Sequence, residues 1–182
     1  MNHTPIFVSE ITKDGLETIG FLYSPDKENT ESMLRVTHDV RDPRVSRVDY
    51  LHVAEWRRGN GLGAQMLRSC AAHLQDEGFH YLRSNSLTTS ALLARRRAFG
   101  EEALQFYDAE HPEEGVLPLS FDQAFDVAER VSVFNELRMI QRRRFYQEDL
   151  PNIELISSIG VLLSLQTIQL DERDLPGYRD SL

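Results

Sequence analysis

The sequence has few of the features that would point to secretion or to a membrane. Its 182 residues include one cysteine, which excludes an internal disulfide and is typical of a reducing compartment. No apolar run approaches the ~20 residues that a membrane-spanning helix needs. The N-terminal stretch Met1–Ile11 shows neither the basic nor the apolar part of a secretory signal. We therefore predict a cytoplasmic protein.

An excess of positive charge is also missing, since the formal net charge is −9 and the isoelectric point is near 5.1. Phosphate backbones bind to basic surfaces, so nucleic acid is disfavoured as a partner. Two local basic runs, Arg95–Arg97 and Arg142–Arg144, stand against this acidic background. Cys70 lies in an apolar helical pattern, and we expect it to be a small buried side chain rather than a nucleophile.

The first third of the chain indicates a series of strands, because β-branched and aromatic residues alternate between turn-forming residues. Strands are predicted over Ile6–Ile11, Thr18–Tyr23, Met33–Val40 and Val45–Ala54. In the fourth strand, alternation places Val48 and Tyr50 on one face. Asp49, Leu51 and Val53 then belong to the opposite face.

Helices enter the pattern after the fourth strand. From Gly61, apolar residues recur with the helical period until Gly78, which is a typical helix stop. Thr88, Thr89 and Ser90 offer N-caps for a second helix. Beyond Gly78 we expect a strand over Tyr81–Leu87, a helix over Ala91–Phe99 ended by Gly100, a strand over Leu104–Tyr107, a loop over His111–Pro118, a helical segment over Phe121–Leu150, one bent strand or a strand pair within Ile153–Leu170 interrupted at Gly160, and a loose tail over Asp171–Leu182.

A glycine-rich turn, Arg58-Gly59-Asn60-Gly61-Leu62-Gly63, joins the fourth strand to the first helix. Glycines permit positive φ and let a ligand approach the backbone, and the N–H groups at a helix N-terminus attract anions. The turn therefore predicts a phosphate or pyrophosphate site. A nucleotide P-loop is excluded, because Ala64-Gln65 stand where Gly-Lys-Ser/Thr is required. A dinucleotide fingerprint fits poorly, because the glycines are spaced by two and three strands precede them.

The segment Val53–Gly63 resembles the cofactor motif of the GNAT acetyltransferases, whose core is Gln/Arg-x-x-Gly-x-Gly/Ala. Arg58, Gly61 and Gly63 occupy those positions, and the order of elements continues as in that family. The resemblance implies an α+β (α/β) fold: a mixed, mostly antiparallel sheet, splayed between the fourth and fifth strands and flanked by helices. We expect one domain over residues 1–182. It would comprise N-terminal strands (1–44), a cofactor-binding core (45–108), and a long helical insertion with the final strand or strands (109–182).

The resemblance further implies an N-acetyltransferase that uses acetyl-CoA as its co-substrate. Pantetheine would bind the backbone near Leu51 and Val53, and one guanidinium of the Arg95–Arg97 run, assigned to Arg96, would contact a phosphate of CoA. No metal site is predicted. The pyrophosphate would lie on the backbone amides of Arg58, Gly59, Asn60, Gly61, Leu62, Gly63 and Ala64.

Acetyl transfer to an amine needs a general base and a general acid. Asp49 is the first candidate for the base. His52 is the second, and strand alternation places it on the face opposite Asp49, unless the strand bulge that the resemblance implies breaks the alternation. The family's usual acid position holds Arg96 and its usual helix-start asparagine is Thr89. Tyr107 lies nearest to that position and is the first candidate for the acid, with Tyr81 and Tyr146 as more remote candidates.

The acceptor can be an amine of a small molecule or an amine of a protein. The acidic composition favours cationic acceptors. The alternatives are an inactive acyl-CoA-binding or interaction module on the same fold, and an acetyltransferase acting on aminoacylated transfer RNA. The helices that the family usually places between its first two strands are missing here. We expect the segment Phe121–Leu150 to cover the acceptor side instead, or to pair with a second chain in a homodimer.

Overall fold

The computed structural model describes residues 6–11, 16–23, 32–39, 44–85, 87–140 and 158–170. Its strands are β1 (Ile6–Ile11), β2 (Leu16–Tyr23), β3 (Ser32–Asp39), β4 (Val45–Val53), β5 (Tyr81–Ser84), β6 (Leu104–Asp108), β7 (Val116–Leu117) and β8 (Ile159–Ser164). Its helices are α1 (Leu62–Asp76), α2 (Thr89–Phe99) and α3 (Phe121–Ile140), with short 3-10 turns η1 (Glu55–Arg57) and η2 (Pro112–Glu114).

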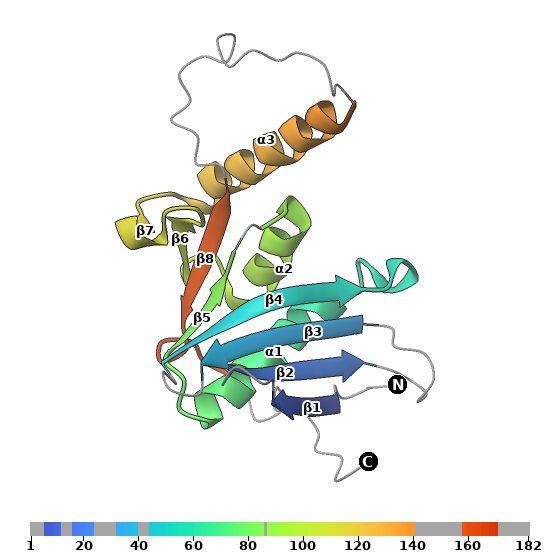
Figure 1. Ribbon diagram of the computed structural model, residues 1–182, viewed down its shortest axis with the longest axis vertical. Helices are drawn as coiled ribbons and strands as arrows, with labels where there is room; N and C mark the ends of the chain where they lie inside the picture. Colours follow the sequence, from blue (N-terminus) through green and yellow to red (C-terminus); the bar gives the residue numbers. More distant parts are fainter. Residues whose placement is uncertain are drawn as a thin grey trace.

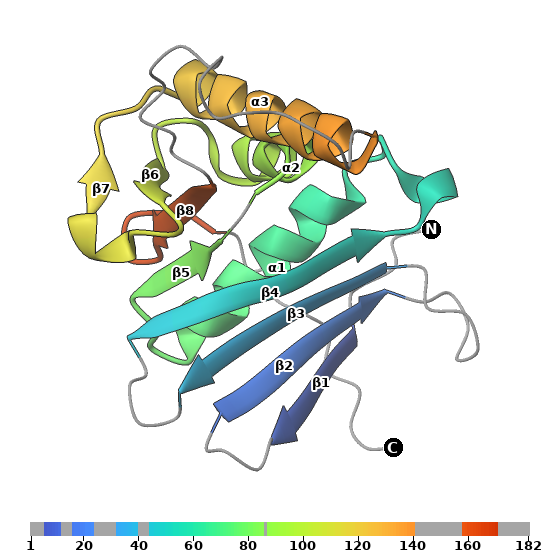
Figure 2. The ribbon, with the colours of Figure 1, turned by 45° about the horizontal axis from the view of Figure 1, so that its top comes forward.

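The strands form one eight-stranded sheet in the order β1-β2-β3-β4-β5-β8-β6-β7 (Figure 1). All neighbours are antiparallel except β4 and β5, which are parallel. The β4–β5 pairing covers only Val45–Val48 against Tyr81–Ser84, and β4 then continues to Val53 without β5. Figure 2 shows β4 and β5 diverging from this point, with α1 behind the gap. The predicted fold class, a mixed sheet splayed at the fourth and fifth strands, is confirmed.

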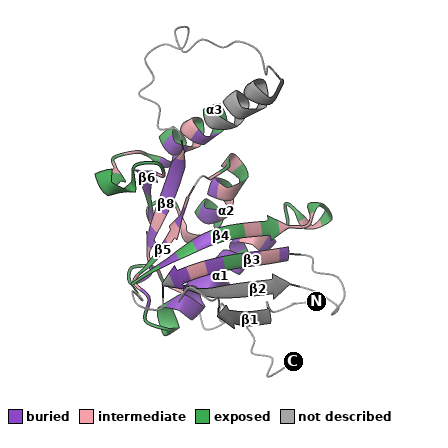
Figure 3. Ribbon diagram, viewed as in Figure 1, coloured by how far each residue is buried: buried purple, intermediate pink, exposed green. Residues whose placement is uncertain are grey.

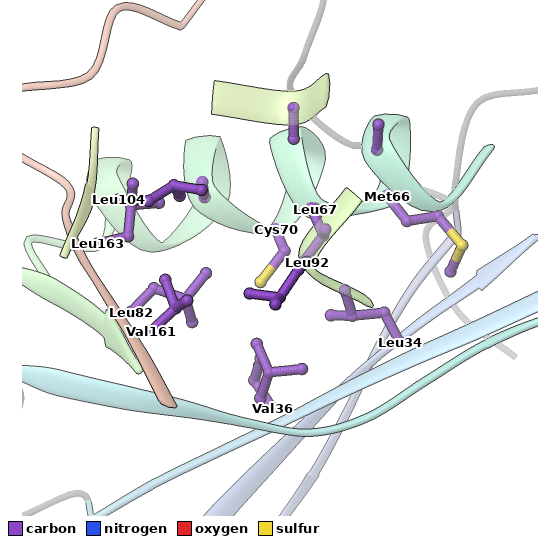
Figure 4. Close-up of a cluster of buried hydrophobic side chains, with 14 of the residues drawn as sticks. Leu34, Val36, Met66, Leu67, Cys70, Leu82, Leu92, Leu104, Val161 and Leu163 are labelled. Atoms are coloured by element: carbon purple, nitrogen blue, oxygen red, sulfur yellow. The ribbon is translucent and has the colours of Figure 1, made fainter. Parts of the chain in front are cut away.

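The core lies between the sheet and the helices α1 and α2. On α1 the residues Met66, Leu67, Cys70 and Leu74 are fully buried, since they recur with the helical period and face the sheet. Figure 4 shows Met66, Leu67 and Cys70 together with side chains from both halves of the sheet, which are Leu34 and Val36 of β3, Leu82 of β5, Leu104 of β6, and Val161 and Leu163 of β8. Figure 3 marks the buried parts of β5, β6, β8 and α1, and their buried apolar residues belong to one core cluster.

Cys70 is an example of a residue that this core buries completely. Its side chain is fully buried, as the sequence predicts, and burial raises the pKa of the thiol well above its usual range, against a smaller opposing effect of Arg95. Truncating a core leucine such as Leu67 to alanine would cost ~2–5 kcal/mol of unfolding free energy. Because its buried face belongs to one core cluster with residues of both halves of the sheet, α1 fixes the two halves relative to each other.

A β-bulge interrupts β4 where it leaves β5. Val36 of β3 pairs with Val48, but the next residue back, Arg35, pairs with Tyr50, so that Asp49 is an extra residue in β4. A bulge reverses which face the later side chains occupy. The predicted alternation is therefore wrong beyond Val48.

The remaining boundaries are close to expectation, with three differences. The fifth strand ends at Ser84 instead of Leu87, because the chain turns there towards α2. The expected loop at His111–Pro118 contains η2 and the short strand β7. Gly160 does not interrupt the final strand, which runs through it and ends at Ser164 instead of Leu170, because a turn follows.

Two predictions fall partly or wholly outside the described residues. Helix α3 confirms the helical segment from Phe121 to Ile140, while positions 141–150 and the tail Asp171–Leu182 lie outside the described residues.

None of the helices formed by the described residues combines the length and apolar character that a membrane crossing requires.

Candidate active site

The glycine-rich turn presents an open helix N-terminus. Gly59 and Gly61 adopt φ values of +84° and +80°, which L-residues with a side chain rarely adopt. Gly61 is the N-cap of α1, and no side chain caps the helix or places an acid in its first turn. Gln65 N–H is the first to bond within the helix, to the Gly61 carbonyl at 3.0 Å. The preceding N–H groups have no intrahelical partner and remain available to an anion.

The three consecutive arginines of α2 point in three directions. Arg97 lies against the turn, where its Nη1 donates to the Gly59 carbonyl at 3.4 Å. A Cβ added to Gly61 would lie 2.8 Å from Arg97 Cζ, so the guanidinium rests directly on this glycine. Arg96, which the sequence assigned to a CoA phosphate, instead has its guanidinium 4.7 Å from the Phe121 ring centroid and 3.4 Å from Glu101 Oε1. The structure brings Arg97, and not Arg96, to the turn.

Arg95 is the buried member of the run, with 3% of its surface exposed. Its Nε and Nη2 donate to Ser84 Oγ at 3.2 and 2.8 Å, and its Nη1 donates to the Ala91 carbonyl at 2.9 Å. Burial lowers the pKa of Arg95 to about 10, and the nearby Cys70 and Tyr107 oppose that effect. Arg95 and Ser84 also line a small internal cavity of about 10 Å³. This guanidinium therefore ties α2 to the end of β5.

The open edge of β4 continues from the turn. Residues 49–53 have β3 on one side and, within the described residues, no strand on the other. Leu51 and Val53 turn their side chains towards α1, since a Cβ added to Gly63 would contact Val53 Cγ2 at 3.5 Å and Leu51 Cδ2 at 3.9 Å. Gly63 thus serves close packing of α1 on β4. Arg58 Nε donates to the Val53 carbonyl at 3.1 Å and fixes the start of the turn.

Tyr107 reaches the splay point from the far half of the sheet. It lies on β6 opposite Gly160 of β8, where a Cβ would come within 2.3 Å of Tyr107 Cζ. The missing side chain at Gly160 gives the ring its place. The hydroxyl donates to the backbone carbonyl of Ser84, the last residue of β5, at 3.0 Å.

The Tyr107 hydroxyl also lies within hydrogen-bond distance of Asn85 Oδ1. A phenol has one proton and cannot donate to the Ser84 carbonyl and the Asn85 carbonyl at once. The Tyr107 hydroxyl therefore donates to one of these two acceptors at a time.

Burial raises the pKa of Tyr107 to about 12, and Arg83, Arg47 and Arg95, in that order, oppose the rise. The hydroxyl is therefore protonated at neutral pH, as a proton donor has to be. Burial makes its phenolate less stable, and the three arginines reduce that cost when the proton passes to a developing anion.

The two candidate bases lie on one face of β4, which corrects the alternation predicted for them. Asp49 Oδ1 accepts from Arg47 Nε at 2.7 Å, and its Oδ2 accepts from the Thr37 hydroxyl. Both partners project from the sheet face opposite α1. His52 projects there as well, stacked on Tyr50 with ring centroids 6.1 Å apart. The physical reason is the bulge at Asp49.

Four residues of this region could not be singled out from the sequence, namely Arg83, Ser84, Asn85 and Gly160. They are brought together by the pairing of β8 between β5 and β6. The one visible signal was Gly160, a glycine inside an apolar strand pattern, which often marks a place where another group approaches closely.

Comparison with known proteins gives matches in structure and none in sequence. Neither protein-family models nor curated proteins match the sequence. Among solved structures, Tetrahymena GCN5 matches with 11% identity and a TM-score of 0.43, covering 84% of this chain and 71% of that one. A GNAT-family acetyltransferase from Staphylococcus aureus Mu50 matches with 9% identity and a TM-score of 0.44, covering 81% and 68%.

The GNAT-family N-acetyltransferase YhbS from Escherichia coli, solved in complex with CoA, is a further match. It has 18% identity and a TM-score of 0.41, and the match covers 57% of this chain and 72% of that one. TM-scores below 0.5 at such identities do not carry an activity over to this chain. What the chain has in common with these proteins is the type of fold, which its own sheet order and splay establish.

Proposed function

We propose that the protein is an acyltransferase that moves an acetyl group from acetyl-CoA directly to an amine. The single observation that carries this is the order of three groups, here called the track: the open N-terminus of α1, the edge of β4 at residues 49–53 with which no other described strand pairs, and the Tyr107 hydroxyl at the end of β5. The track offers anion contacts at one end, backbone hydrogen bonds in the middle and a proton donor at the other. CoA has its phosphates, its pantetheine amides and its sulfur in the same order.

The phosphate end would be held by the turn. The uncapped N–H groups of Leu62, Gly63 and Ala64 and the dipole of α1 favour a pyrophosphate. Arg97 would add a charge-assisted contact, because its guanidinium already lies over Gly61. The side chain of Arg58 is used within the turn, and its contribution would come through the backbone.

The reacting end would be held by β4 and β5. Acetyl-CoA supplies an acetyl group as a thioester, whose carbonyl carbon an amine can attack directly. Backbone N–H groups on the unpaired edge of β4 would polarise that carbonyl. Tyr107 would donate its proton to the sulfur as the C–S bond breaks, and the nearby arginines would stabilise the phenolate until it is reprotonated. His52 is the better placed of the two candidate bases, because both oxygens of Asp49 are occupied.

The experiment follows binding and chemistry separately. Trp56, the single tryptophan, is 66% exposed beside the turn, so its fluorescence, together with calorimetry, would report binding of CoA and acetyl-CoA. Release of free thiol with a panel of amines would report transfer. Absence of CoA binding would overturn the proposal.

The variant Tyr107→Phe separates the two parts of the proposal. It should leave the CoA dissociation constant unchanged and lower kcat by ~10²-fold, the lower end of the usual contribution of a general acid. A kcat equal to that of the unmodified protein would remove Tyr107 from the mechanism.

A second candidate is a non-catalytic module that binds acyl-CoA. It is favoured by the ion pair that occupies Asp49 and by an arginine at position 96, where the family resemblance leads one to expect a tyrosine. CoA binding without thiol release across the whole panel would support this module instead.

A further inference from the structure

Two arginines lie side by side where β4 and β5 part. Arg47 and Arg83 are register partners in the β4–β5 ladder, one position before its last pair. Both project to the sheet face opposite α1, since their neighbours Ser46, Val48, Leu82 and Ser84 are buried. Like charges on neighbouring strands are destabilising. A local conflict of this kind is expected at functional sites more than elsewhere.

Only one of the two arginines is neutralised. Arg47 Nε pairs with Asp49 Oδ1 at 2.7 Å. Arg83 has its guanidinium 5.7 Å from the Tyr107 ring centroid, and among the described residues no carboxylate lies within ion-pair distance of it. Its side chain is half-buried, so water screens its charge less than that of a fully exposed arginine.

The field at the Tyr107 hydroxyl shows the same imbalance. Arg83 has the largest electrostatic effect on the pKa of that hydroxyl, followed by Arg47 and Arg95, and no carboxylate contributes. The glutamates of the segment after β6 lie in an exposed stretch, where Glu113 pairs with His111. The reacting end of the site is therefore locally positive, although the whole chain carries −9.

We propose that Arg83 binds a carboxylate at the reacting end of the site, carried either by the amine acceptor or by the acyl group of the CoA thioester. This rests on the proposed function and refines its substrate class. A guanidinium presents parallel N–H donors that match a carboxylate, and it is costly to leave half-buried without an anion. A bound carboxylate would also relieve the repulsion between Arg83 and Arg47. The preference for cationic acceptors expected from composition would then not apply at this site.

The acceptor arm of the test compares amino acids with their carboxamides, which differ in charge but hardly in size. With acetyl-CoA as donor, the unmodified protein should show a kcat/KM at least ~10-fold higher for the carboxylates, since tenfold corresponds to one contact of ~1.4 kcal/mol. The acyl arm compares succinyl-CoA with butyryl-CoA as donors, using an acceptor amine that carries no carboxylate. A preference in one arm identifies which substrate carries the carboxylate.

The variant Arg83→Met should abolish the preference in that arm, whereas Arg83→Lys should retain part of it. Arg96→Met is the matched control, because Arg96 is a more exposed arginine that pairs with Glu101, and it should leave the preference unchanged. The CoA dissociation constant of each variant reports whether its fold is intact. No preference in either arm, or a preference that survives in Arg83→Met, would overturn the proposal.

A binding measurement keeps the role of Arg83 testable if transfer fails. N-acetyl amino acids and succinyl-CoA carry the carboxylate, while N-acetyl amino acid amides and butyryl-CoA lack it. Calorimetry should show tighter binding of the carboxylate member of one pair, and Arg83→Met should remove the difference. Failure of CoA itself to bind would count against the proposed function, while equal binding within both pairs would count against Arg83.

Discussion

The two ends of the proposed track are built in different ways. The turn at residues 58–64 is contiguous in sequence and works through backbone groups and glycine conformations. The reacting end is assembled from β5, β6, β8 and α2 and works through side chains, most of them buried, that contact one another. A contiguous site tolerates changes elsewhere in the fold. An assembled site depends on every strand that contributes to it.

The largest expected effect comes from filling the space beneath Tyr107. In Gly160→Ala the new Cβ would meet Tyr107 Cζ at 2.3 Å, so the ring has to leave its place. Overpacking of this kind costs ~1–3 kcal/mol, which for a chain of this size lowers Tm by ~2–10 °C. We expect turnover to fall at least as far as in Tyr107→Phe, with CoA still bound at the turn. Thermal unfolding and thiol release measure the two effects.

A double-mutant cycle tests whether the collision with the Tyr107 ring causes the loss of stability in Gly160→Ala. Tyr107→Ala alone leaves a cavity, but it also removes the ring atoms that collide with the methyl group introduced by Gly160→Ala. The combined variant should therefore be more stable than the sum of the two single changes indicates. Strict additivity would show that Gly160 and Tyr107 do not compete for the same space.

The second-largest expected effect comes from a substitution that distorts the turn and leaves the reacting end intact. Gly61→Ala forces a side chain into positive φ, at ~1–2 kcal/mol, and pushes Arg97 away from the turn. We expect CoA affinity to fall by ~10- to 100-fold, in line with a loss of ~1.4–2.8 kcal/mol of binding free energy. Titration of Trp56 fluorescence measures it.

Gly63→Ala is the matched control within the same turn. Gly63 does not have positive φ, and its new Cβ would make ordinary contacts, the nearest with Val53 Cγ2 at 3.5 Å. This variant should bind CoA within a few-fold of the unmodified protein. Equal losses in both variants would mean that the ligand needs the space of any glycine here rather than the conformation of Gly61.

The difference between the two regions also explains what could be predicted from the sequence. The turn was found because its chemistry is local, with strand, glycines and helix following one another. The fold class followed from the resemblance of this turn, and of the elements after it, to a known family. The partnership of Tyr107 with Ser84 and Gly160 could not be found, because it depends on β8 entering between β5 and β6.

Two smaller differences between expectation and structure have equally physical causes. One extra residue at Asp49 moved His52 to the same face as Asp49, and no pattern of apolar residues marks a bulge. Among the three arginines of α2, a rotation of about 100° per residue decides which one reaches the turn. From the sequence, one guanidinium of the run was expected at a CoA phosphate and Arg96 was named, whereas the packing of α2 on α1 presents Arg97 to the turn.

The third-largest expected effect tests whether Arg97, rather than Arg96, binds a phosphate of CoA. Arg97→Met should weaken CoA binding by about tenfold, as expected for one charged hydrogen bond at a partly solvated site. The loss should shrink at high salt, where the phosphate contact is screened. Arg96→Met should leave the affinity unchanged, since its guanidinium contacts Phe121 and Glu101. The opposite result in calorimetry would restore Arg96 as the phosphate ligand.

The smallest effect is spectroscopic and concerns the protonation of Tyr107. Its pKa is raised to about 12 by burial, whereas in the unfolded chain it returns to ~10. The folded state therefore holds this proton more tightly, and the stability gained from it is present below pH ~10 and is lost as the pH rises towards 12. Absorbance at 295 nm should show one of the six tyrosines ionising last, and Tyr107→Phe should remove that final step. If the step remained in Tyr107→Phe, or if Tyr107 ionised with the others, the hydroxyl would be in contact with water and burial would not control its pKa.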